Sequence, residues 1–244
     1  YCTMIYLGWH PLLSILFSIV VCTVLGVAIE AFAYKPLRRA GSLAVLITAI
    51  GVSYLLQNAA LLIWGSTPKI FTSVVNIKPL SLFGGKLTIT AESIVTVAAC
   101  VLIMIGLTLF TQKTKMGKAM RAVSEDKDAA ELMGVNVNTT ISTTFAIGSA
   151  LAAVAGVLLC SAYPTLVPTT GSMPGIKAFT AAVFGGIGSI PGAMLGGIML
   201  GIIEIFSKSY ISTSLSDAIV FAVLIIVLLV KPTGILGKKV TEKV

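Results

Sequence analysis

Charged residues are scarce in this sequence, and their scarcity excludes a water-soluble fold. Asp, Glu, Lys and Arg make up 11% of the 244 residues, whereas hydrophobic residues make up 57%. Soluble domains carry about 25% charged residues, so this chain has too few charges to cover a surface that faces water. The charge-free windows 1–29, 40–68, 132–176 and 178–203 all exceed the roughly 20 residues that a helix needs to cross a bilayer.

The apolar runs predict helices rather than a transmembrane β-barrel. Segments such as 21–29 and 219–230 are apolar on every side, whereas barrel strands alternate apolar and polar residues. We therefore expect an all-α, polytopic membrane protein with one transmembrane domain over residues 1–244. The predicted spans are about 11–34, 42–64, 92–111, 139–162 and 215–230, with two shorter apolar pieces at 176–184 and 193–206. A short hairpin outside the bilayer is expected from 74–79 and 86–90, around Phe83-Gly84-Gly85.

The residue patterns of enzymes are also missing. The sequence has one histidine, His10, no nucleotide-binding Gly-x-x-x-x-Gly-Lys-[Ser/Thr] motif and no nucleophile motif. Its cysteines lack disulfide or metal spacing and are expected to be small buried apolar side chains; they are Cys2, Cys22, Cys100 and Cys160. We therefore expect no enzyme activity, no catalytic residue, no metal site and no cofactor.

Basic residues lie between the predicted spans and indicate the orientation of the chain. The net charge of +8 suggests nucleic-acid binding, but few aromatic residues accompany the Lys and Arg, so membrane orientation explains the charge better. The positive-inside rule places 35–39, 113–127 and the C-terminal tail from Lys231 in the cytoplasm. Segment 175–208 must then leave and return on the outer side. We expect either a re-entrant pair or two short helices there.

Glycine and proline interrupt the apolar sequence near the C-terminus. Irregular backbone at membrane depth is tolerated where it is buried in protein or lines a cavity, and broken helices often form transport sites. This segment is therefore predicted to line a substrate pathway, through Gly185, Gly186, Gly188, Ser189, Pro191 and Gly192. The small residues that follow, Gly196, Gly197 and Gly201, are predicted to let helices approach closely.

Two acidic residues, Glu30 and Glu204, lie within predicted apolar segments beyond the first helical turn. A carboxylate at the bilayer centre costs ~3 kcal/mol, so each one needs a physical reason. For Glu204 two interpretations stay open: it lines the pathway, or it lies near the outer interface and pairs with Lys208 at i+4. Glu30 lies one turn before Tyr34 and Lys35, and an interfacial ion pair is favoured for it over a pore position.

The longest polar stretch, residues 112–138, has a pattern of small and charged residues. This pattern predicts short amphipathic helices with small residues on one face and Gly134 as a stop; the residues of that face are Ala119, Ala122, Val123, Ala129, Ala130 and Leu132. A solvated charged loop is one interpretation. The other is a docking surface on which a partner's groove closes against the backbone.

Four segments, in the expected order, resemble LivH-type permeases of branched-chain amino acid ABC transporters. They are Glu30–Arg38, Ile50–Asn58, Met116–Asn138 and Gly175–Glu204. The sequence departs from the family at Ala31 and Lys35, where Arg is frequent. The family also has an N-terminal portion with a further span, and we expect it to precede Tyr1.

The resemblance implies ATP-driven import of branched-chain or other hydrophobic amino acids across a prokaryotic plasma (inner) membrane, with a cytoplasmic C-terminus. As protein partners it implies a related permease subunit in a heterodimer and two cytoplasmic ATPase subunits. It also implies a periplasmic or extracellular substrate-binding protein that delivers the amino acid near 163–175. The chain is expected to contact membrane lipid and no nucleic acid. The ATPases are expected to act on the coupling segment, 112–138, through Gly117, Arg121, Ala122, Glu125, Asp126, Ala129, Ala130 and Gly134. An ion-coupled secondary amino acid carrier that uses Glu204 is the alternative.

Overall fold

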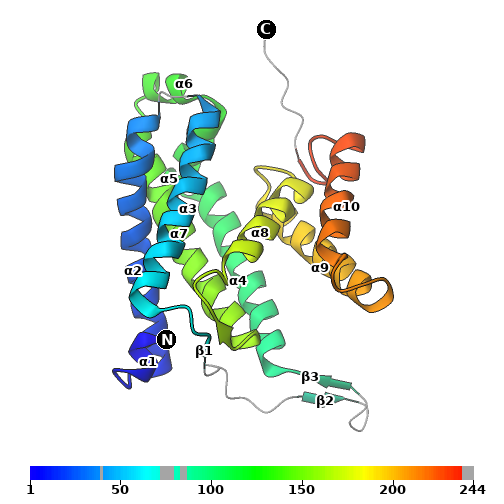
Figure 1. Ribbon diagram of the computed structural model, residues 1–244. Helices are drawn as coiled ribbons and strands as arrows, with labels where there is room; N and C mark the ends of the chain where they lie inside the picture. Colours follow the sequence, from blue (N-terminus) through cyan, green and yellow to red (C-terminus); the bar gives the residue numbers. More distant parts are fainter. Residues whose placement is uncertain (39–40, 72–79, 83–86, 238–244) are drawn as a thin grey trace. The chain divides into compact units, whose positions relative to one another are not determined.

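Long apolar helices dominate the computed structural model, which describes residues 1–38, 41–71, 80–82 and 87–237 (Figure 1). Within these ranges, five helices are long and apolar enough to cross a membrane. They are Pro11–Leu37, Leu43–Trp64, Ala91–Lys113, Val137–Ala162 and Ile190–Tyr210. The shorter apolar helix Ser216–Val230 follows. The predicted all-α, polytopic class is confirmed.

The first half of the chain begins with the short helix α1 and then runs through three long helices, α2, α3 and α4. The elements are α1 (Cys2–Ile5), α2 (Pro11–Ile29), the π-helical turn η1 (Glu30–Tyr34), the 3₁₀ turn η2 (Lys35–Leu37), α3 (Ser42–Trp64) and α4 (Ala91–Lys113). Arg39 of the predicted cytoplasmic cluster lies outside the described residues, as do Lys238, Lys239 and Lys243 of the tail.

The second half contains two short polar helices and then four apolar ones. They are α5 (Lys115–Glu125), α6 (Lys127–Leu132), α7 (Val137–Ala162), α8 (Ser172–Gly185), α9 (Ile190–Tyr210) and α10 (Ser216–Val230). The predicted pieces 176–184 and 193–206 correspond to α8 and α9, which are longer at both ends. The turn between them, residues 186–189, interrupts the helix; its depth in the bilayer stays a prediction.

Polar side chains cap the starts of the helices around the predicted coupling segment, 112–138. The Thr114 hydroxyl accepts a hydrogen bond from the Gly117 N–H (3.0 Å), and the Asp126 carboxylate accepts one from the Ala129 N–H (3.0 Å). The Asn136 side chain does the same for the Thr139 N–H (3.0 Å). Since each cap satisfies a backbone donor that the helix leaves free, the sequence itself fixes where α5, α6 and α7 begin.

Two small antiparallel ladders accompany the helices. One ladder is a hairpin of β2 (Leu80–Leu82) and β3 (Leu87–Ile89), with Leu82 opposite Leu87. Its second strand lies within the predicted strand 86–90, but its first strand, 80–82, was not predicted. The first predicted strand, 74–79, and the predicted Phe83–Gly85 turn lie outside the described residues. The second ladder pairs β1 (Lys69–Ile70) with β4 (Thr165–Leu166). It was not predicted, because two-residue strands have no detectable period.

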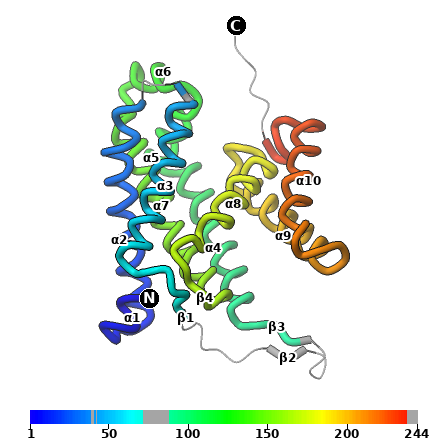
Figure 2. Tube along the Cα trace, in the orientation of Figure 1, coloured from blue at the N-terminus to red at the C-terminus, as the bar shows by residue number. Residues whose placement is uncertain are grey.

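The chain divides into two compact units. The first comprises residues 1–98 and 111–170, and α2 packs along α7 within it (Figure 2). The second comprises 99–110 and the chain from 171 onward, and its core consists of Phe184, Leu200 and Val220.

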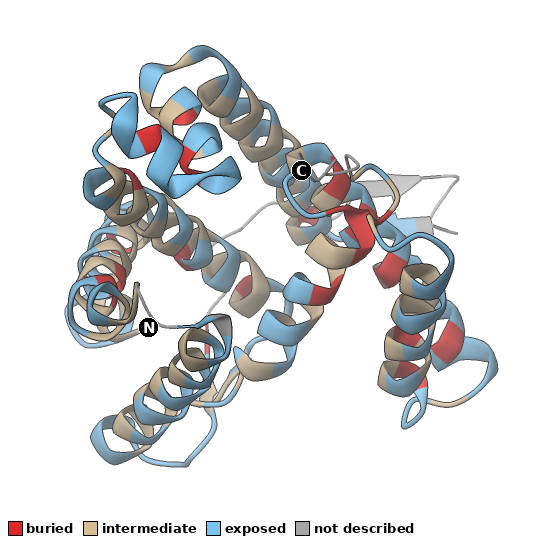
Figure 3. Ribbon diagram, turned by 90° about the horizontal axis from the view of Figure 1, so that it is seen from above, coloured by how far each residue is buried: buried red, intermediate tan, exposed pale blue. Residues whose placement is uncertain are grey.

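Large apolar side chains are exposed on many helix surfaces, where Figure 3 shows far more exposed than buried residues. Leu43 and Leu62 of α3, for example, are 74% and 88% exposed. Many of the buried residues are small or polar, among them Ser14, Gly26, Thr140 and Ser161. This inverted pattern is typical of helices whose outer faces contact lipid and whose contacts rely on small residues.

Candidate functional site

The predicted coupling segment forms two short helices whose outer face is charged. Of its predicted residues, Gly117 and Ala130 are buried; the exposed ones are Arg121, Ala122, Glu125, Asp126, Ala129 and Gly134. Val123 is buried as well, and both α5 and α6 pack on α7. The segment is therefore an ordered surface of amphipathic helices, and the interpretation as a loop is wrong. Its ATPase-coupling role stays a prediction.

An apolar pair at the end of α6 was not predicted to be exposed. Leu132 and Met133 are 89% and 84% exposed, whereas the sequence pattern placed Leu132 with the small residues of an amphipathic face. Gly134 ends the helix as predicted, with a φ of +81°, and the next N–H, that of Val135, donates to the Ala130 carbonyl (3.0 Å). This hydrogen bond closes the C-terminal end of α6 and turns the chain away from the helix. The Leu132 and Met133 side chains therefore project from the end of α6.

A polar groove of about 500 Å³ lies beside α6. Acidic and basic side chains both line it, with the start of α7 on one side; the lining residues are Arg38, Lys127, Asp128, Glu131, Gly134, Val135, Asn136, Val137 and Asn138. The groove and the Leu132–Met133 pair together give this end of the unit both polar and apolar docking features.

The predicted ion pair of Glu30 is present, and its partner is Arg38. The Glu30 residue is 1% exposed. Its carboxylate accepts hydrogen bonds from the Arg38 guanidinium and from the Ser142 hydroxyl (2.7 Å), and Arg38 also donates to the Asn138 side-chain oxygen. We name Glu30, Arg38, Asn138 and Ser142 the α2–α7 polar cluster. The sequence pattern suggested Lys35 as a neighbour, but tertiary packing brings Arg38 to the carboxylate.

Glu204 belongs to a four-residue ionic network in the second unit. Its Oε1 lies 2.5 Å from the Lys208 Nζ, as the i+4 interpretation predicted, and 2.9 Å from the Lys177 Nζ. Lys177 also pairs with Asp217 (2.7 Å). The sequence pattern gave no sign that Lys177, in the second turn of α8, and Asp217, in the first turn of α10, join this network. Antiparallel packing of α8 on α9 brings Lys177 beside the last turns of α9.

Close backbone contacts explain several of the predicted pathway glycines. A Cβ atom added at Gly185 would lie 1.9 Å from the Gly192 carbonyl oxygen, and one at Gly196 would lie 2.3 Å from the Ala181 carbonyl oxygen. Gly186 has a φ of +109°, and its added Cβ would lie 2.3 Å from the Gly237 nitrogen. Glycine is therefore required here for packing of α8 on α9 and on the tail.

The other residues of this segment shape the turn or lie in open space. Ser189 caps α9 by accepting a hydrogen bond from the Gly192 N–H (3.1 Å), and Pro191 lies in the first turn. Gly188 has a φ of +89°. The packing role predicted for Gly196 is confirmed, whereas an added Cβ at Gly201 would meet no atom of the described chain within 4 Å. Contact of any of these residues with a substrate stays a prediction.

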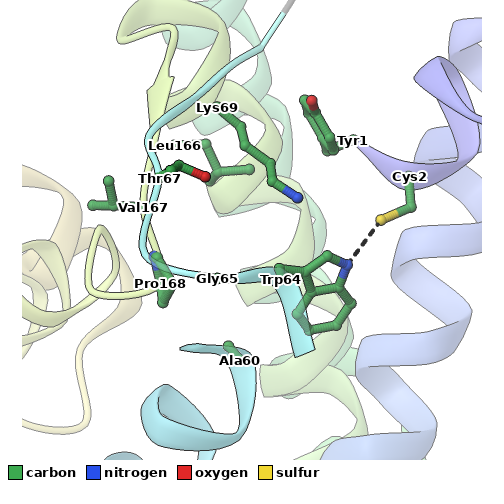
Figure 4. Close-up of a pocket in the computed structure, with 10 residues that line it drawn as sticks. All are labelled: Tyr1, Cys2, Ala60, Trp64, Gly65, Thr67, Lys69, Leu166, Val167 and Pro168. Carbon is green, nitrogen blue, oxygen red and sulfur yellow. Dashed lines mark hydrogen bonds between the residues drawn. The ribbon is translucent and has the colours of Figure 1, made fainter. Parts of the chain in front are cut away.

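A second, mainly apolar pocket of about 280 Å³ lies where α3 and α7 end (Figure 4). Its lining consists of Tyr1, Cys2, Ala60, Trp64, Gly65, Thr67, Lys69, Leu166, Val167 and Pro168. The Lys69 Nζ lies 5.3 Å from the centroid of the Tyr1 ring, and the Trp64 Nε1 donates to the Cys2 Sγ (3.1 Å). Trp64 is the last residue of the predicted span 42–64, and 166–168 belong to the predicted delivery segment 163–175. The pocket therefore combines apolar walls with one cation.

No cluster of His, Cys, Asp and Glu suited to a metal ion occurs in the part of the chain that the structure describes. The carboxylates of Glu30 and Glu204 instead pair with basic side chains.

Comparison with known proteins gives consistent matches over most of the chain. A family model described as the permease component of branched-chain amino acid transport systems matches residues 1–228. The high-affinity branched-chain amino acid permease LivH of Escherichia coli K12 is 46% identical over 231 residues, which cover 93% of this chain and 74% of LivH. The permease BraD of Pseudomonas aeruginosa is 45% identical over 232 residues, covering 93% and 75%.

A more distant relative extends the comparison. The probable branched-chain amino acid permease LivH of Methanocaldococcus jannaschii is 33% identical over 246 residues, which cover 94% of this chain and 76% of that protein. No solved structure matches the chain significantly.

Proposed function

The chain belongs to the family of branched-chain amino acid permease components, and we propose that it forms part of the membrane pathway of an ATP-driven importer for branched-chain or other hydrophobic amino acids. The observation that carries the proposal is the combination of span-length helices with the ordered, exposed helix pair α5–α6. The comparisons support the permease hypothesis. They give no support to the alternative, an ion-coupled carrier that uses Glu204.

The α5–α6 pair is the proposed docking surface for the cytoplasmic ATPase. The sequence has no nucleotide-binding Gly-x-x-x-x-Gly-Lys-[Ser/Thr] motif, so a separate subunit must hydrolyse the ATP. The exposed residues Arg121, Glu125 and Asp126 give the surface its charges, and Leu132 and Met133 give it an apolar anchor. Buried apolar anchors with a polar surround are the usual composition of a specific interface.

The opposite ends of α3 and α7 form the proposed outer surface. The positive-inside rule puts 113–127 in the cytoplasm, and α7, which follows that stretch, then ends outside. The β1–β4 ladder and the apolar pocket with Lys69 lie at this end. We propose that the binding protein releases its amino acid here, where apolar walls suit the side chain and the Lys69 ammonium suits the carboxylate.

The substrate is proposed to pass the glycine-rich turn of the second unit. This role falls on Gly185, Gly186, Gly188, Ser189, Pro191 and Gly192, with Glu204 in the pathway wall. The positive-φ glycines and the capped start of α9 interrupt the regular helix in an otherwise apolar segment. Polar backbone groups therefore lie outside regular helix at this turn.

The working assembly is proposed to contain a related permease subunit, two ATPase subunits and a binding protein, in a prokaryotic inner membrane with the C-terminus in the cytoplasm. ATP-driven closure of the ATPases displaces α5–α6. The permease then alternates between outward- and inward-facing states, because the ATPases bind one state better than the other.

Uptake by proteoliposomes tests this function. The vesicles hold the complete transporter, the binding protein is outside, and ATP is supplied on the ATPase side. Labelled leucine should accumulate only with ATP and with binding protein. Accumulation driven by an ion gradient in the absence of ATP would overturn the proposal.

A further inference from the structure

Two regularly spaced rows of residues meet where α2 and its continuation pack on α7. One row recurs at every fourth position, and the other at every third or fourth. The rows are Gly26, Glu30, Tyr34 and Arg38 on one side and Asn138, Ser142, Phe145 and Ser149 on the other. Residues at this spacing share one face of a helix, so the rows define a continuous interface.

Close packing and polar contacts alternate along this interface. A Cβ atom at Gly26 would lie 1.8 Å from the Ser149 Oγ, so the Ser149 side chain packs directly against the backbone of α2. The rings of Tyr34 and Phe145 pack with their centroids 5.1 Å apart. The α2–α7 polar cluster lies among these contacts and adds directional bonds to the packing.

The polar cluster crosses the interface in two places. Ser142 of α7 donates to one oxygen of the Glu30 carboxylate, and Arg38 bonds to the other oxygen and to Asn138 of α7. A carboxylate that is 1% exposed is stable only when such partners are kept, and loss of one partner leaves an uncompensated charge. The cluster therefore favours one relative position of α2 and α7.

The cluster lies directly beside the proposed docking surface for the ATPase. Asn138 is in the first turn of α7, and Asn136 caps that turn. The Val135 N–H donates to the Ala130 carbonyl of α6 (3.0 Å), so a tight turn joins α6 to α7. Arg38 and Asn138 also line the polar groove beside α6. A displacement of α6 therefore acts first on the turn of α7 that holds the cluster.

A π-helical turn occurs where α2 reaches this cluster. The Lys35 N–H donates to the Glu30 carbonyl oxygen, five residues earlier, in place of the usual four-residue spacing. Such turns are rare in helices and frequent at functional sites. The helix thus changes its register at the residue whose side chain is bonded to α7.

We propose that Glu30, Arg38, Asn138 and Ser142 are positioning residues that pass movement of the coupling helices from α7 to α2. The inference rests on the proposed function. The ion pair and the Ser142 hydroxyl hold the cytoplasmic end of α2 to the start of α7, so the two helices tilt together when the ATPases close. Without the cluster, ATP hydrolysis still moves α6 and α7, but less of that movement reaches α2.

The test measures leucine imported per ATP hydrolysed by the complete transporter in proteoliposomes. The variants are E30Q, which removes the carboxylate charge, and S142A, which removes one donor to it. The matched control is T143A, the next residue on α7, whose hydroxyl donates only to the Thr139 carbonyl of its own helix (2.8 Å). We expect E30Q to lower the ratio about fivefold or more, S142A to lower it less, and T143A to leave it unchanged.

The amount of assembled complex is measured alongside, because a purely structural cluster has a different signature. If the cluster only stabilises the fold, less complex assembles but each complex keeps the wild-type ratio, and the inference is wrong. If E30Q does not assemble, S142A decides, and equal ratios for S142A and T143A overturn the inference. If the wild-type transporter shows no ATP-driven import of leucine, the proposed function is wrong instead.

Discussion

Gly185 and Gly192 bring the backbones of α8 and α9 into direct contact. An added Cβ on Gly185 would lie 1.9 Å from the Gly192 carbonyl oxygen, and one on Gly192 would lie 2.6 Å from the Gly185 carbonyl oxygen. Because these obstacles are backbone atoms, a change of side-chain rotamer cannot relieve them.

The Gly185→Ala variant should therefore destabilise the second unit. We expect a loss of about 2 kcal/mol, the usual cost of overpacking, seen as a lower melting temperature of the purified protein in detergent. Gly201→Ala is the control, since its Cβ meets no described atom within 4 Å and alanine favours a helix. Equal melting temperatures for the two variants would disprove the packing role.

Replacing both Leu132 and Met133 by alanine should weaken the binding of the ATPase. These side chains are 89% and 84% exposed at the end of α6, and apolar interface anchors commonly contribute enough for about a tenfold change in affinity. Binding of purified ATPase to the permease in nanodiscs measures the change. Leu62→Ala removes an equally exposed side chain, 88%, from α3 and should have no effect. If the wild-type permease, the double variant and Leu62→Ala bind the ATPase with the same affinity, Leu132 and Met133 are not part of the interface.

Trp64→Ala should impair uptake at the outer surface. The indole forms part of the apolar pocket beside Lys69, and its loss removes an apolar wall from the proposed release site. We expect a rise of about tenfold in the concentration of loaded binding protein that gives half-maximal uptake, with little change in the maximal rate. Trp9→Ala is the control, because Trp9 packs on Phe17 and does not line the pocket. An identical response in the two variants would argue against a release site here.

The Glu204→Gln variant distinguishes the two interpretations of Glu204, a position in the pathway wall and an ion pair alone. If the carboxylate contributes to the pathway wall, the KM for leucine uptake should rise about tenfold, as expected for loss of a charged hydrogen-bonding group. Lys208→Gln removes the i+4 partner but leaves the carboxylate beside Lys177, and should leave KM unchanged. Equal KM values for both variants would leave Glu204 with an ion-pairing role alone.

Four of the five span-length helices were predictable from the sequence, because lipid requires a run of about 20 apolar residues in each crossing helix. The fifth, Ile190–Tyr210, is longer than the predicted short piece 193–206, whereas the predicted span 215–230 is the shorter helix Ser216–Val230. The run that ends at Trp64 was predicted as 42–64, and the structure has Ser42–Trp64. Gly134 was likewise predictable as a helix stop, since its positive φ is a property of one residue. Local chemistry of this kind does not depend on the rest of the fold.

Contacts between distant segments were not predictable in the same way. The sequence suggested that Glu30 forms an ion pair, yet the choice of Arg38 and Ser142 depends on how α2 packs on α7. The partners Lys177 and Asp217 could not be recognised from the sequence, because each is an isolated charge near the first turns of its helix until α8, α9 and α10 pack together. The exposure of Leu132 also follows from which face of α6 rests on α7, and periodicity over six residues does not specify that face.

The β1–β4 ladder closes a loop that contains most of the first unit. Residues about 100 positions apart become neighbours, and because each doubling of loop length costs only ~0.6 kcal/mol of chain entropy, closing this loop costs little more than closing one of half its length. Lys69 stands opposite Leu166, and the Phe71 N–H extends the pairing to the Pro164 carbonyl (2.7 Å). The ends of α3 and α7 are therefore tethered, and a rearrangement of these helices that keeps the tether must pivot at this end and open at the other.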